Sequence, residues 1–183
     1  SLAAILVPSR HVAGEIEDGA LELLLALPVR RQAVACTLWL GTGLALAVLV
    51  LGCELGTGLG MLLYPDVAGA VRAAGLARTG FNLWLLVFTV GSYALLFSVF
   101  ARERSQAGLR AAGLTLFFYF FYFAVRIWPS LDGLRPFTLF HYYQPQQLMA
   151  DGAGWGRPVA VLAVLLLVTG ATAVLHLGRR DIP

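Results

Sequence analysis

The chain has 183 residues, of which 59% are hydrophobic and 13% are charged. A soluble domain carries about a quarter charged residues, so this composition excludes an ordinary soluble globule and indicates an integral membrane protein. The 13 basic residues are all arginine and lie scattered at the ends of apolar runs, so the net charge of +3 does not indicate nucleic-acid binding. Because the sequence has no lysine, it also lacks the phosphate-binding loop of a P-loop ATPase.

Residues 1–9 are uncharged but too short for the roughly 20 residues that a spanning helix needs, so they are interpreted as the remnant of a span. The concentrated charge of residues 12–28 predicts an amphipathic helix, with Glu15, Asp18 and Glu22 opposite an apolar face. Pro28 ends this helix because it lacks an N–H. The helical wheel leaves open whether the segment receives force from a partner or only links two spans at the interface.

The first complete span is predicted over about residues 32–60, because 22 uncharged residues follow Arg31 and the apolar sequence continues beyond them. Gly52, Gly56 and Gly60 recur at intervals of four, the small-residue spacing that lets membrane helices approach closely, and they are the predicted helix-packing positions. Glu54 falls opposite this ridge. It is either an intramembrane ion or proton site or a residue of the outer headgroup zone.

Residues 67–80 are rich in small residues and weakly periodic, which predicts an external loop or a short surface helix. The second span is predicted over residues 81–101, which carry no charge. The third is predicted over residues 110–128, and its centre holds seven consecutive aromatic residues, 117–123. These rings would form a stacking platform for an amphipathic substrate or face lipid and neighbouring helices, and Arg126 would either reach the interface or be buried.

Residues 129–157 form the longest polar interval and are predicted to lie outside the membrane. His141 stands here beside two tyrosines, but no cysteine or carboxylate cluster accompanies it, so a wet interfacial belt is favoured over a metal or acid–base site. The last span is predicted over residues 158–178, which contain no charged residue and precede Arg179.

Alternating crossings place eight arginines on one side of the membrane and five on the other. The side with the excess is predicted to be cytoplasmic. The amphipathic helix and the C-terminus both fall on that side, where a soluble partner could reach the helix.

The sequence of residues 15–31, EIEDGALELLLALPVRR, resembles the segment E-x-E-x-G-T-L-E-L-L-L-S-x-P-V-S-R of the ATP-binding-cassette type-2 (ABC-2) transporter permeases. Ala20 stands where threonine is usual and Arg30 where serine is usual, whereas the glycine, the Leu-Glu-Leu-Leu-Leu run and the proline are kept. The ending Arg179-Arg180-Asp181-Ile182 is similar to the family's frequent R-R-D-I terminus, and residues 140–145 also resemble family sequence.

The resemblance implies an all-α, polytopic transmembrane helical bundle with a short cytoplasmic coupling helix, N-terminally truncated relative to a six-span permease. It implies one permease domain in the inner (plasma) membrane, paired with a second permease copy and with a separate ATPase subunit that binds ATP and Mg. No cofactor is expected in this chain. The residues expected to couple to the ATPase are Glu15, Glu17, Asp18, Gly19, Leu21, Glu22, Leu24 and Pro28.

The function that this implies is ATP-driven transport, interpreted as export, without enzymatic activity in this chain. A membrane-embedded assembly protein with its own chemistry would instead require clustered nucleophile, base or metal residues at one depth, and the sequence offers none. A secondary transporter would require paired intramembrane charges and internal repeats. Glu54 and Arg126 form only a weak pair, and no repeat is visible.

Overall fold

The computed structural model describes residues 31–64, 73–100, 104–150 and 154–179. Among them, four helices are long and apolar enough to cross a membrane: α3 (Arg31–Leu63), α5 (Ala73–Phe100), α6 (Arg104–Ile127) and α8 (Gly156–Arg179). Between α6 and α8 lie two 3-10 helices, η1 (Pro129–Phe137) and η2 (Leu139–Tyr142), and the short α7 (Pro145–Ala150). The predicted all-α, polytopic helical bundle is confirmed.

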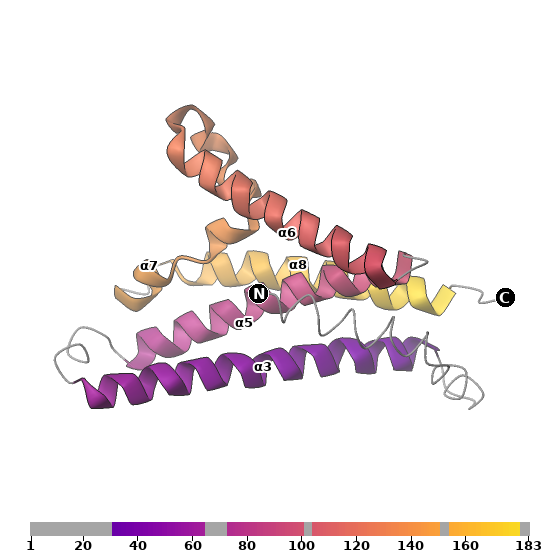
Figure 1. Cartoon of the computed structure of the whole chain (residues 1–183), viewed down its shortest axis with the longest axis horizontal. Helices are drawn as coiled ribbons and strands as arrows, with labels where there is room; N and C mark the ends of the chain where they lie inside the picture. Colours follow the sequence, from indigo (N-terminus) through magenta and orange to yellow (C-terminus); the bar gives the residue numbers. More distant parts are fainter. Residues whose placement is uncertain (1–30, 65–72, 101–103, 151–153, 180–183) are drawn as a thin grey trace.

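Helix α5 forms the centre of the bundle, between α3 and α8 (Figure 1). In its most apolar window 67% of the residues are buried, against 17–28% in the other three spans. Small and hydroxyl side chains make this burial possible, because a serine or threonine in a helix can donate its hydroxyl to a carbonyl one turn earlier. Thr79 and Thr89 do so, to Gly75 and Leu85. Helix α5 contacts each of the other three spans, and it is also the span with the most small polar residues.

Helix α6 departs from this arrangement. It begins beside the end of α5 and diverges from α5 along its length, and the segment from η2 to α7 then returns toward the bundle (Figure 1). A hydrogen bond between the hydroxyls of Tyr93 and Thr115 joins the last third of α5 to the middle of α6. The aromatic run of α6 is largely unpacked within this chain, since Phe117, Tyr119, Phe120 and Phe123 are all more than half exposed. Tyr119 packs edge-on against Phe140, and the exposed surfaces of these four side chains are available to lipid or to another chain.

Two boundaries differ from the sequence expectation. Residues 73–80 are not a loop or a separate surface helix but the first two turns of α5, and α6 begins at Arg104, before the predicted 110. The first difference has a packing cause: Gly75 lies against the backbone of Met149, and Gly80 lies against Glu54. Small residues that looked like a loop thus allow close approach of α7 and α3 to a continuous helix.

Candidate functional site

The eight predicted ATPase-coupling positions lie in residues 12–28, outside the described residues. Their roles remain predictions. The described chain begins immediately beyond them, because α3 starts at Arg31, three residues after Pro28.

The predicted glycine ridge does not contact another helix among the described residues. A Cβ placed at Gly52, Gly56 or Gly60 would meet nothing within 4 Å. Their role in packing stays a prediction for a partner outside the described part of this chain. The closest glycine contacts of α3 and α8 occur at Gly43, which meets the ring of Phe88, and at Gly170, which meets the indole of Trp39.

Trp39 joins three helices. Its ring lies against Gly170 of α8, its centroid is 5.1 Å from that of Phe88, and its indole N–H donates to the hydroxyl of Ser92 on α5 over 2.7 Å. Trp84 bonds in the opposite direction, from α5 to α3: its indole N–H donates to the carbonyl of Gly43 at 2.9 Å. Buried polar groups in a membrane are satisfied internally in this way, and such bonds fix the rotation of one helix against the next.

Glu54 lies on the face of α3 that meets α5, although the glycine ridge on the opposite face was the predicted packing surface. It borders a groove of about 910 Å³ between the two helices, and it is the only charged residue among the described residues that line this groove. One of its carboxylate oxygens, Oε2, is buried without a hydrogen-bond partner in the described structure. Neither of the two predicted roles for Glu54 is decided by this placement.

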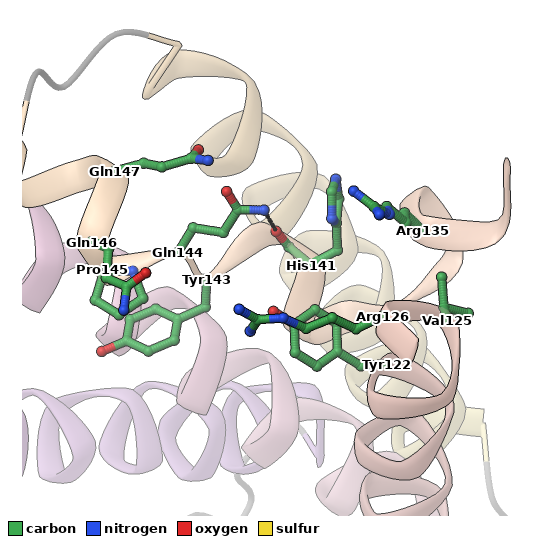
Figure 2. Close-up of a pocket in the computed structure, with 10 residues that line it drawn as sticks. All are labelled: Tyr122, Val125, Arg126, Arg135, His141, Tyr143, Gln144, Pro145, Gln146 and Gln147. Atoms are coloured by element: carbon green, nitrogen blue, oxygen red, sulfur yellow. Dashed lines mark hydrogen bonds between the residues drawn. The ribbon is translucent and has the colours of Figure 1, made fainter. Parts of the chain in front are cut away.

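A polar cavity lies beside the last turns of α6, between α6 and the segment that follows it (Figure 2). Its volume is about 360 Å³. The end of α6 contributes Arg126, whose side chain extends toward Tyr143 and Gln144 (Figure 2). The remaining lining residues that carry polar side chains are Tyr122, Arg135, His141, Gln146 and Gln147.

The polar residues of this cavity are held in place by apolar neighbours that pack inward. Leu139 and Leu148 are buried, and Thr138 is fully buried, with its hydroxyl donating to the carbonyl of Arg135 over 2.8 Å. The amide of Gln144 donates to the carbonyl of His141 at 3.3 Å. These contacts fix the backbone of the segment whose polar side chains line the cavity.

Positive charge dominates this cavity. The pKa of His141 lies below its usual range because the ring is partly desolvated and because Arg135 and Arg157 stand near it, so the imidazole is neutral at pH 7. Burial, together with the nearby carboxylate of Glu54, raises the pKa of Tyr143, which keeps its hydroxyl protonated as a donor. Arg135 also forms an ion pair with Asp132 at 2.6 Å.

Sequence reasoning identified part of this site. It placed residues 129–157 outside the membrane and singled out His141 and Arg126, but it did not bring them together with Arg135, Arg157 and Gln147. In the sequence, three arginines are spaced around one aromatic and glutamine-rich segment, and this spacing is the signal that could have indicated the site. Among the described residues, no group of three His, Cys, Asp or Glu side chains could hold a metal ion.

Comparison with known proteins gives two matches. Residues 1–182 match the family described as "ABC-2 family transporter protein". The chain is also 36% identical over 176 residues to a Pseudomonas aeruginosa protein named "Probable ABC transporter permease protein NosY". That alignment covers 87% of this chain and 63% of the relative, so the chain spans less than two thirds of the relative's length.

Proposed function

The chain belongs to the ABC-2 family of transporter permeases, and from that premise we propose that it forms the membrane path of an exporter driven by a separate ATPase subunit. The observation that carries the proposal is the family match across residues 1–182, which includes the acidic amphipathic segment. In this proposal the ATPase binds ATP and Mg, a second permease copy completes the path, and residues 12–28 and the C-terminus face the cytoplasm of a bacterial inner membrane.

Helix α3 supports a mechanical role for residues 12–28. It is a continuous helix of 33 residues, about 50 Å long at 1.5 Å per residue, and it follows the amphipathic segment almost directly. Near its start Trp39 contacts both α5 and α8, and near its far end Glu54 contacts Gly80 of α5. A displacement at the cytoplasmic end would therefore reach contacts at both depths of the bundle.

We infer a mechanism of two alternative packings. Docking of the ATPase on Glu15, Glu17, Asp18 and Glu22, with Leu21, Leu24 and Pro28 giving the segment its shape, would hold residues 12–28. ATP-driven closure of the ATPases would then tilt α3 and favour one arrangement of the bundle over the other, because a ligand shifts an equilibrium only by its differential affinity for the two states.

Charge reversal tests this proposal. The double substitution Asp18→Arg and Glu22→Arg in the intact transporter should abolish transport-coupled stimulation of the ATPase and its co-purification, while membrane insertion is retained. Asp181→Arg is the matched control, since it reverses a charge on the same predicted side but outside residues 12–28. Unchanged stimulation in the double variant would contradict the assignment, and a permease that purifies without any ATPase would favour a secondary transporter.

A further inference from the structure

We propose that the polar cavity beside the last turns of α6, with a second cavity that adjoins it, is a binding site for a phosphate group, carried by a lipid headgroup or by a soluble phosphate compound. The inference concerns residues of α6, α8 and the segment between them. It depends neither on the ATPase partner nor on the direction of transport, so it can fail independently of the proposed function.

The two cavities form one site. The second has a volume of about 400 Å³ and shares Arg135, His141, Gln144 and Gln147 with the first. Arg126 lines only the first cavity. The second cavity adds Arg157 and Trp155 at the start of α8. Together they offer room for a phosphate group and the part of the molecule that bears it.

Three guanidinium groups surround this space without an equal number of carboxylates. No carboxylate is among the described residues that line either cavity. Asp132 pairs with Arg135, whereas the guanidinium groups of Arg126 and Arg157 have no ion pair or hydrogen bond with another described residue. Guanidinium groups bind phosphate oxygens through two parallel N–H bonds, which makes arginine the preferred partner of this ligand.

Several neutral groups of the site can donate hydrogen bonds. The indole N–H of Trp155 is buried with no acceptor among the described residues, and a buried donor without an acceptor is destabilising. The hydroxyl of Tyr143 and the side-chain amides of Gln144 and Gln147 are further donors at the cavity wall. A phosphate group carries several acceptor oxygens and no fixed donor, so it complements this set.

The depth of the site fits both sources of phosphate. Its residues Tyr122, Val125 and Arg126 belong to the last turns of α6, at the end remote from the α5–α6 link, where the candidate span ends at Ile127. Headgroup phosphates and soluble phosphates both reach this level, and arginines at helix ends interact with lipid headgroups there.

The test uses the intact transporter in a non-ionic detergent. Binding of inorganic phosphate is measured by calorimetry at constant ionic strength, and binding of phosphatidylglycerol is measured by native mass spectrometry. The double variant Arg126→Gln and Arg157→Gln should weaken one or both by about tenfold or more, since each hydrogen bond to a charged group contributes about 1.5–3 kcal/mol. Arg110→Gln is the matched control, because Arg110 is exposed at the other end of the same helix.

The two arms separate the sources. Loss of phosphate binding in the variant identifies a soluble ligand, and loss of phosphatidylglycerol binding alone identifies a headgroup site. Binding of both ligands equal to that of Arg110→Gln overturns the proposal. The double variant Arg126→Lys and Arg157→Lys keeps both positive charges, so it controls for a loss of binding that is caused by misfolding. It should bind more weakly than the wild type but more tightly than the glutamine variant, because lysine lacks the bidentate fork.

Discussion

The junction of Trp39 with Gly170 provides the sharpest test of the bundle packing. A Cβ at Gly170 would lie 2.5 Å from Cε2 of Trp39. Carbon atoms in contact prefer about 3.5–4.0 Å, so in Gly170→Ala the indole must move by about 1 Å or more. That movement disrupts the 2.7 Å hydrogen bond to Ser92 and the contact with Phe88.

The expected cost follows from two terms. Overpacking a filled site costs about 1–3 kcal/mol, and losing a hydrogen bond between membrane helices costs about 1 kcal/mol. Gly170→Ala should therefore lower the free energy of unfolding by about 2–4 kcal/mol. The measurement is reversible unfolding in mixed micelles with increasing SDS, followed by far-ultraviolet circular dichroism.

The control is Gly113→Ala in α6, where an added Cβ meets nothing within 4 Å. It should leave stability unchanged or raise it by up to about 1 kcal/mol, because alanine favours a helix over glycine. In a Trp39→Phe background the cost of Gly170→Ala should fall below about 1 kcal/mol, since the smaller ring vacates the space. If Gly170→Ala is as stable as Gly113→Ala, the close contact of α3 with α8 is not present in the protein.

Two further predictions concern α6 and the polar cavity beside its last turns. Tyr93→Phe should lower the free energy of unfolding by about 0.6–1.5 kcal/mol, because the hydroxyls of Tyr93 and Thr115 bond to each other. In a Thr115→Val background the same substitution should lower it by less. Equal losses of stability in this double-mutant cycle would refute the interhelical bond. His141 should titrate below 6.5 in histidine-labelled NMR spectra, and Arg157→Gln should raise its pKa. Since the folded-state pKa is lowered, the unfolded chain binds more protons between that pKa and about 6.5, so the stability contributed at His141 falls as the pH drops through this window and is constant above it. An unchanged pKa in Arg157→Gln would show that Arg157 does not act on the ring.

Some elements of the fold followed from the sequence because they depend on local composition. Apolar runs long enough to cross a bilayer must form helices there, since no water is available to bond the backbone. Thus the four spans and the polar interval of residues 129–157 were predictable. Residues 73–80 were not, because their glycines and alanines look like a loop until Met149 and Glu54 are seen to pack against them.

The glycines show the same limit. Gly52, Gly56 and Gly60 have the regular spacing of a packing ridge, yet Gly43 and Gly170 are the glycines that meet aromatic rings from other helices. Spacing along one helix shows which residues share a face, but it does not show where that face points. The rotation of α3 depends on Trp39 and Trp84, whose partners lie 53 and 41 residues away in the chain.

By itself, the sequence determined that this is an α-helical membrane protein of the ABC-2 family, because hydrophobic length and a family motif are both local properties of a chain. Only the tertiary structure decided that α5 is the buried centre, that α6 diverges from it, and that Arg126, Arg135 and Arg157 surround one polar site. These three arginines come from the end of α6, from η1 and from the start of α8. Their like charges are brought together by the burial of Leu139 and Leu148, which fixes the connecting segment against the bundle.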